Sequence, residues 1–298
     1  MIIIIITLIS ANILGSIRRS ELDKIKEIIR AIRYNKLSNA EEIKLGRNLA
    51  EVEDEIKSMF LRTQNDISNL KKLEQVRTEF LGNVSHELRT PIFAIQGFIE
   101  TLLDGALEDP KVNRNFLIKA NQHTLNLNNL LNDLIDISMI ESGQMKMSYR
   151  YFNANEFLEP IVTEFKTHID NKSIELIFVP AKSSTQVYGD KERLKQVLIN
   201  LITNAVKYTE EGRIEIGIAE EEKRCRIFVK DTGIGIEEKN LARIFERFYR
   251  VDKDRSRAVG GTGLGLAIVK HIIDAHGSKM EVKSQFGIGS EFSFYLKK

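Results

Sequence analysis

Apolar residues recur at helical spacing, with few interruptions, from residue 18 to about residue 142. Near the end of this stretch four of them follow at steps of three, four and three, as in the seam of a coiled coil or helix bundle: Leu127, Leu130, Leu134 and Ile137. An earlier series has mostly the same spacing: Ile67, Leu70, Leu73, Val76, Phe80 and Val84. Gly105 and Pro110 mark a turn between the two helices, and Gly143 is the expected end of the second. Because a single hairpin cannot cover two such seams, we expect two copies to pair into a four-helix bundle.

Two shorter amphipathic patterns precede the hairpin. The first has apolar residues on one helix face: Leu22, Ile25, Ile28, Ile29 and Ile32. After a polar break near residues 35–40, the second resumes this spacing: Leu45, Leu49, Val52, Ile56 and Met59. Two such helices joined by a connector resemble a HAMP signalling module, although the proline common in the first helix of that family is absent. A plain coiled-coil stalk is the alternative.

The first 17 residues carry no charge and are followed by Arg18 and Arg19. As a helix they would reach about 26 Å, against a hydrocarbon core of about 30 Å. A secretory signal would carry its positive charge before the apolar run. We therefore expect a single-pass membrane anchor, with the arginine pair holding the rest of the chain in the cytoplasm. The alternative is an apolar start to a buried helix.

The pattern changes from about residue 150. Short β-type runs appear at residues 174–179, 213–218, 224–230, 279–284 and 290–296, with helical patterns at 190–207 and 264–276. The expected fold class is therefore α+β and multidomain, with a helical hairpin that forms a dimeric four-helix bundle, followed by an α/β sandwich. The expected domains are a membrane anchor helix (1–17), a HAMP-like or coiled-coil linker (18–66), a dimerisation domain (67–146) and an α/β domain (150–298).

Charge and cysteine usage exclude some classes of function. The 44 Lys and Arg against 42 Asp and Glu leave a formal net charge of +2. This balance argues against nucleic-acid binding, which needs a concentrated basic surface. The single cysteine, Cys225, cannot form an intramolecular disulfide, so a reducing compartment is expected. Cys225 stands in an alternating run, where a small strand residue is expected rather than a reactive thiol.

One histidine stands in the string Phe80-Leu-Gly-Asn-Val-Ser-His-Glu-Leu-Arg-Thr-Pro91. Phosphoryl transfer to imidazole needs an exposed, unprotonated ring nitrogen in line with the γ-phosphate. Glu87 can accept the other ring N–H of His86 and so fix the tautomer. Pro91 lacks an N–H, so the helix can bend there. A His-Glu pair alone is more often a solvated helix face, but the whole string resembles the phosphoacceptor H-box of sensor histidine kinases. In that family Thr90 helps to position water for dephosphorylating the partner regulator.

Further strings with binding chemistry follow in the last third of the chain. Asn200 and Asn204 share one face of a helix, and an amide oxygen is a suitable hard ligand for Mg²⁺. Lys207, one turn on, can reach phosphates. A lone Asn-x-x-x-Asn is otherwise common on exposed helices.

The string Asp231-Thr-Gly233-Ile-Gly235-Ile236 follows a strand. Its glycines permit close approach to a ligand, and a buried carboxylate can accept a hydrogen bond from the amine of adenine. Taken alone, this string is more often a turn. The string Phe245-Glu-Arg-Phe-Tyr-Arg250 then leads into a polar stretch with Lys253, Arg255 and Arg257. This stretch suits a mobile cover over a triphosphate, the alternative being a solvated loop.

The string Gly260-Gly261-Thr262-Gly263-Leu264-Gly265-Leu266 opens a helix. Backbone N–H groups at a helix N-terminus, approached closely because glycine lacks Cβ, form an anion site. The spacing fits neither a P-loop nor a Rossmann loop.

In this order, the strings resemble the N, G1, F and G2 boxes of the histidine-kinase ATP-binding domain, the Bergerat fold, over about residues 70–298. The resemblance implies that Asn204 holds Mg²⁺, that Lys207 and Arg250 contact phosphates, and that Asp231 recognises adenine. It places further residues at the ATP site: Asn200, Tyr208, Gly233, Gly235, Ile236, Gly261, Thr262, Gly263, Leu264, Gly265 and Leu266.

The resemblance implies a homodimeric kinase of the bacterial inner membrane, with a histidine phosphotransfer domain (67–146) and an ATP-binding catalytic domain (150–298). It would use ATP and Mg²⁺ to phosphorylate His86, with Glu87 and Thr90 as further catalytic residues. The phosphate would then pass to an aspartate of a response regulator receiver domain. Related Bergerat ATPases, such as chaperones or topoisomerase subunits, have a carboxylate where Asn200 stands and lack the H-box. A non-enzymatic signalling scaffold would show a damaged H-box or N-box, and neither is seen.

Overall fold

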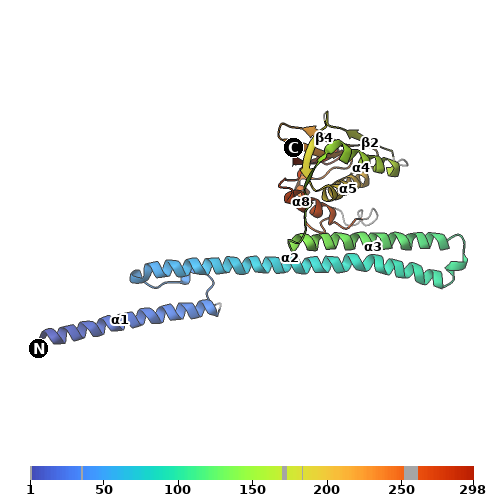
Figure 1. Ribbon diagram of the computed structural model, residues 1–298. Helices are drawn as coiled ribbons and strands as arrows, with labels where there is room; N and C mark the ends of the chain where they lie inside the picture. Colours follow the sequence, from blue (N-terminus) through green and yellow to red (C-terminus); the bar gives the residue numbers. More distant parts are fainter. Residues whose placement is uncertain (1, 35, 170–172, 183, 252–260) are drawn as a thin grey trace. The chain divides into compact units, whose positions relative to one another are not determined.

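The computed structural model describes residues 2–34, 36–169, 173–182, 184–251 and 261–298. The chain divides into two compact units, Met1–Leu81 and Gly82–Lys298. Figure 1 labels the elements along the chain, and each unit is described by itself below.

The first unit contains helix α1 (Ile2–Arg33) and the beginning of α2 (Ala50–Leu103). Two short 3₁₀ helices, η1 (Ala40–Glu42) and η2 (Arg47–Leu49), lie in the connector between them. The uncharged first 17 residues and the first amphipathic pattern thus belong to one continuous helix. By length and composition α1 is long and apolar enough to cross a membrane.

A small core holds the connector of the first unit. It consists of Ala40, Ile43 and Phe60, with half-buried apolar residues packed against it: Ile28, Ile32, Leu37 and Ile56. The Leu45 backbone N–H donates to the Glu53 carboxylate at 2.8 Å. Leu45 was expected on the second helix, but it lies buried in the connector because α2 begins only at Ala50, after Gly46 turns the chain at a φ of 105°. The two helical patterns and a connector between them are confirmed.

The second unit begins within α2, which forms a hairpin with α3 (Asn113–Glu141) through a turn containing η3 (Ala106–Glu108). Figure 1 shows α3 running back beside the C-terminal part of α2. The predicted seam of α3 faces inward, with Leu130 and Ile137 buried. Gly143 follows α3 in the left-handed region at a φ of 65°, as expected for a helix end.

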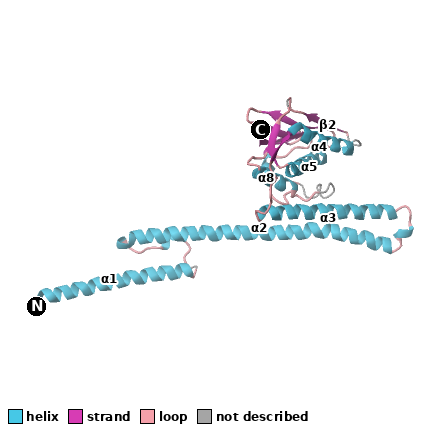
Figure 2. Ribbon diagram, viewed as in Figure 1, coloured by secondary structure: helices cyan, strands magenta, loops and turns pink. Residues whose placement is uncertain are grey.

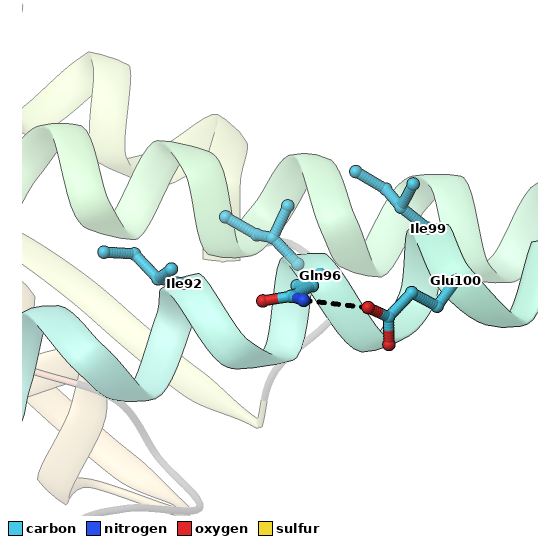
Figure 3. Close-up of a pocket in the computed structure, with 5 residues that line it drawn as sticks. Ile92, Gln96, Ile99 and Glu100 are labelled. Carbon is cyan, nitrogen blue, oxygen red and sulfur yellow. Dashed lines mark hydrogen bonds between the residues drawn. The ribbon is translucent and has the colours of Figure 1, made fainter.

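The outer face of the hairpin stays apolar and exposed. The exposed large side chains are Ile92, Phe93, Ile99 and Leu103 on α2, and Leu117, Ile118, Leu125, Leu131 and Ile135 on α3. On α2 a surface depression of about 500 Å³ is lined by residues of one helix face: Ile92, Ile95, Gln96, Ile99 and Glu100. Figure 3 shows Ile92 and Ile99 along this face, beside the 2.8 Å hydrogen bond from Gln96 to Glu100.

A seven-stranded sheet forms one layer of the C-terminal region. Its strands are β1 (Arg150–Asn153), β2 (Ile174–Val179), β3 (Gln186–Gly189), β4 (Gly212–Glu220), β5 (Arg224–Asp231), β6 (Glu281–Gln285) and β7 (Gly289–Lys297). The order is β1-β3-β7-β5-β4-β2, and β6 also pairs with β7. The β2–β4 pair is parallel and the other pairs are antiparallel.

Three helices form the second layer: α4 (Ala154–Ile169), α5 (Lys191–Tyr208) and α8 (Gly265–Ala275). Figure 2 shows them on one side of the sheet. Strand β5 explains how the sequence builds this core, because its alternate residues Cys225, Ile227 and Val229 are buried. The predicted α+β class and the predicted strands and helices are confirmed. The short strands β1 and β3 and helix α4 were not predicted.

Candidate functional site

His86 lies on α2 with its side chain 58% exposed, so its ring can meet a ligand. Its Nδ1 atom lies 3.6 Å from Oε1 of Glu87, close but beyond hydrogen-bond distance. Thr90, one turn later, donates its hydroxyl to the His86 carbonyl at 3.2 Å. Helix α2 continues through Pro91 to Leu103. The three predicted catalytic residues therefore lie together on about one helical turn.

Helix α5 carries the asparagines. It begins at a strong N-cap, where the Asp190 carboxylate accepts from the backbone N–H groups of Glu192 and Arg193. Asn200 and Asn204 are half-buried and share a face one turn apart. A Cβ built on Gly265, at the start of α8, would lie 3.2 Å from the Asn200 amide oxygen. The glycine thus leaves room beside the Asn200 amide oxygen, and an amide oxygen is a donor that fits Mg²⁺.

Two cations lie near these amides. Burial, reinforced by the guanidinium of Arg250, lowers the pKa of Lys207 from 10.5 to about 8. The Lys207 ammonium lies 5.1 Å from the ring centre of Tyr208 and close to Gly261, where a Cβ would lie 2.7 Å from it. Burial also raises the pKa of the Tyr208 hydroxyl. A half-buried ammonium whose pKa is lowered by burial and by a neighbouring guanidinium is suited to binding an anion.

Asp231 ends β5 on the buried side of the strand. Its Oδ1 accepts from the backbone N–H of Gly233 at 2.9 Å and of Ser290 at 3.2 Å. Burial raises the pKa of the Asp231 carboxyl, and these two hydrogen bonds oppose the rise. Gly235 has a φ of 66°, and a Cβ there would lie 2.0 Å from the Gln285 carbonyl oxygen, so only glycine lets the loop lie this close to β6.

The glycine loop before α8 is held from two sides. The Gly263 carbonyl accepts from the Phe248 N–H at 2.9 Å, and a Cβ on Gly263 would meet the Phe248 backbone. The Thr262 hydroxyl oxygen accepts from the Leu264 N–H at 3.2 Å. Leu264 is buried, whereas Leu266 is half-buried. Gly260 and the predicted cover residues Lys253, Arg255 and Arg257 lie outside the described residues.

Contacts within the second unit link the helical hairpin to these residues. The Arg250 guanidinium lies 3.9 Å from the Glu87 carboxylate. On α3, Asp133 accepts from the Thr262 hydroxyl at 2.8 Å. These contacts join residues far apart in the sequence. Asp133 belongs to none of the motif strings, so its contact with Thr262 was not predicted.

Some further residues near the candidate site were also missed. Ser284 accepts from the Ile236 N–H at 2.8 Å, and its Oγ lies 2.9 Å from that of Ser290. Both serines had been assigned only to strands. Ser290 lies opposite Asp231 and Ser284 lies opposite Ser290 through strand pairing, which spacing along the chain does not reveal.

Two family models match the chain. Residues 76–143 match the His Kinase A (phospho-acceptor) domain, HisKA. Residues 189–298 match the histidine kinase-, DNA gyrase B- and HSP90-like ATPases. The two matches cover the segments that carry His86 and the predicted ATP-site residues.

Curated relatives match over most of the chain. It is 38% identical over 234 residues to the sensor histidine kinase WalK of Bacillus subtilis, covering 78% of the chain and 38% of WalK. It is 36% identical over 243 residues to the sensor protein SrrB of Staphylococcus aureus, covering 81% of the chain and 42% of SrrB. The chain thus spans about two fifths of the length of these relatives.

Solved structures share the fold. The histidine kinase ThkA in complex with the response regulator protein TrrA matches with a TM-score of 0.61 and 28% identity, over 80% of the chain and 66% of that chain. The Acinetobacter baumannii histidine kinase AdeS matches with a TM-score of 0.59 and 29% identity, over 71% and 97%. ShkA in complex with AMPPNP matches with a TM-score of 0.56 and 28% identity, over 76% and 46%.

Proposed function

Because the chain belongs to the family of sensor histidine kinases, we propose that it transfers the γ-phosphate of ATP to His86. The observation that carries this proposal is the 3.9 Å approach of Arg250 to Glu87. It brings a residue expected to contact phosphates next to the neighbour of the acceptor histidine. In this proposal residues 67–146 accept the phosphate and residues 150–298 bind ATP.

The chemistry at His86 follows from its surroundings. With the Nδ1–H directed at Glu87, the Nε2 lone pair is left to attack the γ-phosphorus. The new Nε2–P bond forms as the bond from the γ-phosphorus to the bridging oxygen breaks, and ADP leaves. The imidazole becomes positively charged, and the Glu87 carboxylate stabilises it and can take the Nδ1 proton.

The candidate ATP site supplies binding and orientation. Asp231 accepts a hydrogen bond from the adenine amine, while Lys207 and Arg250 contact the phosphates and Tyr208 flanks the nucleotide. The loop from Gly261 to Gly265 presents backbone N–H groups to the phosphates at the start of α8. Asn204, with Asn200 on the same face, would hold Mg²⁺, which neutralises phosphate charge when bound. The AMPPNP complex of the similar protein ShkA supports the nucleotide assignment.

The phosphate then passes to an aspartate on the receiver domain of a response regulator. The complex of the similar kinase ThkA with the regulator TrrA supports this class of partner. Thr90 would orient the water that later removes the phosphate from the regulator, because its hydroxyl lies one turn from His86 on α2.

We further propose a homodimer attached to a membrane. The exposed apolar face of the hairpin, with Ile99 and Leu103 on α2, supports pairing with a second copy. The uncharged beginning of α1, followed by Arg18 and Arg19, supports a single-pass anchor with the catalytic part in the cytoplasm. Residues 18–66 would connect the anchor to the hairpin as a HAMP-like or coiled-coil linker.

Autophosphorylation tests the proposal directly. With γ-labelled ATP and Mg²⁺, the protein should gain label that is labile to acid and stable to base, as a phosphorylated imidazole is. His86→Gln should abolish the label and leave ATP affinity within about twofold, because the acceptor is lost and the nucleotide site is not. Label that persists in this variant on another histidine would contradict the assignment of His86.

A further inference from the structure

Three polar residues lie in a row across three neighbouring strands at the edge of the candidate ATP site. Ser284 on β6 pairs with Ser290 on β7, and Ser290 pairs with Asp231 on β5. Apolar residues otherwise fill the sheet centre nearby, including Val229 and Phe292. A row of this kind can transmit the position of one polar group to the next.

Hydrogen bonds connect the row to the loop after β5, which contains Gly233 and Gly235. The Ser284 Oγ accepts from the Ile236 N–H at 2.8 Å and lies 3.0 Å from the Gly289 carbonyl oxygen and 2.9 Å from the Ser290 Oγ. The Ser290 N–H in turn donates to the Asp231 carboxylate. The half-buried Ser284 hydroxyl therefore joins the loop after β5 to β7, the strand whose Ser290 N–H donates to the Asp231 carboxylate.

Two further contacts hold the loop after β5 against the turn that follows β6. The Gly287 N–H donates to the Ile234 carbonyl at 2.7 Å, and Gly235 lies against the Gln285 carbonyl with no room for a side chain. Ser284 is the side chain that fixes the next residue, Ile236. Without its hydroxyl, the half-buried backbone N–H of Ile236 would lose its acceptor. The loop, which Gly233 joins directly to Asp231, would then lose its hydrogen bond to the row of polar residues.

The hydroxyl of Ser284 also constrains that of Ser290. If Ser284 donates to Ser290, the Ser290 proton can point to a ligand; if it donates to Gly289, Ser290 can donate back to Ser284. In either arrangement Ser284 determines which way the polar group beside Asp231 is directed. Purines differ at this edge, because adenine presents an amine donor where guanine presents a carbonyl acceptor.

We propose that Ser284 is a positioning residue that sets the selectivity of the site for adenine over guanine. This inference rests on the proposed function, in which Asp231 receives the adenine amine. Ser284 acts through Ile236 and Ser290. These two residues hold the loop after β5 and the Asp231 carboxylate at the spacing that the base requires.

Nucleotide selectivity separates this role from a general effect on folding. Affinities for ATP and GTP are measured with the full chain by displacement of a fluorescent ATP analogue, together with the melting temperature. The variants are Ser284→Ala, Ser284→Thr, which keeps the hydroxyl, and Ser278→Ala as a matched control. Ser278 also accepts a backbone N–H from β7, from Tyr295 at 3.1 Å, but lies outside the row.

Ser284→Ala should weaken ATP binding about five- to tenfold and leave GTP binding within about twofold, so that selectivity falls, as expected for the loss of one hydrogen bond. Ser284→Thr should stay within about twofold of the wild type for both nucleotides. Ser278→Ala should keep wild-type selectivity, with a melting temperature lowered about as much as in Ser284→Ala.

Several results would overturn the inference. These are an unchanged ATP affinity in Ser284→Ala, an equal loss for ATP and GTP, the same loss of selectivity in Ser278→Ala, or no recovery in Ser284→Thr. A wild-type protein that does not bind ATP would instead overturn the proposed function, so the two failures are distinguishable.

Discussion

The α/β region and the helical hairpin differ in how far they bury their apolar side chains. In the α/β region Leu198 and Phe294 are completely buried within one chain, between the sheet and its helices. In the hairpin Ile99 is 47% exposed and Leu103 is 76% exposed, although both are large apolar residues one turn apart on α2. The α/β region is therefore complete in one copy, whereas the hairpin has one seam covered and another left open.

This difference separates two kinds of function. The α/β region can hold a nucleotide with residues of one chain. Asp231 accepts from two backbone N–H groups of its own domain, and the loop before α8 is held by Phe248 and by Asp133 on α3 of the same chain. The open region presents His86 on an exposed helix beside a face that suits a second copy. Binding is expected to be independent of assembly, while the stability of the acceptor helix depends on it.

The largest expected effect concerns the exposed apolar face of α2 that contains Ile99. Ile99→Glu places a charge on a surface that would be buried twice in a symmetric dimer, so the dissociation constant should rise at least about a hundredfold. Sedimentation or light scattering over a range of concentrations measures this change. A dimer of unchanged affinity would show that the face containing Ile99 is not the interface.

Leu198→Ala is the matched substitution in the complete region. It should lower the free energy of unfolding by about 2–5 kcal/mol, because a fully buried leucine leaves a cavity. This loss should not depend on protein concentration, whereas that of Ile99→Glu should. If both variants showed the same dependence on concentration, the distinction between the two regions would fail.

The next effect tests whether the complete region alone recognises the base. Asp231→Asn should weaken ATP binding roughly ten- to a hundredfold, since an amide cannot replace a carboxylate that accepts from the adenine amine without reorienting. The dimer should be unaffected. Calorimetry on the purified variant measures the affinity, and an unchanged value would mean that the nucleotide is placed wrongly.

Thr90 tests the chemistry of the hairpin. Thr90→Ala should retain autophosphorylation and transfer but lose regulator dephosphorylation by about tenfold or more, because the hydroxyl orients water but does not accept phosphate. The alternative follows from its hydrogen bond to the His86 carbonyl, through which Thr90 could simply support the helix near Pro91. Comparing the two rates on one preparation decides between them, since equal losses would remove Thr90 from the site.

The smallest effect is a dependence of ATP binding on pH. Lys207 has a pKa of about 8 in the folded chain, and a bound triphosphate would raise it. Nucleotide affinity should therefore fall above pH 8, by at most about tenfold per pH unit, and Lys207→Arg should remove this dependence. The free energy of unfolding depends on pH in the opposite direction to ATP affinity. Between about pH 8 and 10.5 Lys207 is protonated in the unfolded chain and mostly neutral in the folded chain, so stability rises there with pH. Affinity that rises with pH would contradict the position of Lys207.

Much of this organisation could be predicted from the sequence. Periodicity identified the hairpin seam of Leu130 and Ile137, and alternation identified β5, because both patterns are local. The candidate site residues came from motif strings whose roles remain predictions. The short strands β1 and β3 were not predicted, because four residues give too little alternation. The partners of Asp231 and Thr262 were also missed, since Ser290 and Asp133 meet them only through the folded chain.

Reconstitution from two fragments tests the division of labour between the regions most directly. Residues 150–298, which lack His86, are mixed with residues 67–146 and γ-labelled ATP with Mg²⁺. The account predicts label on the 67–146 fragment alone, and none when that fragment carries His86→Gln or when the other carries Asn204→Asp. Label on the 150–298 fragment, or on the 67–146 fragment with His86→Gln, would contradict it.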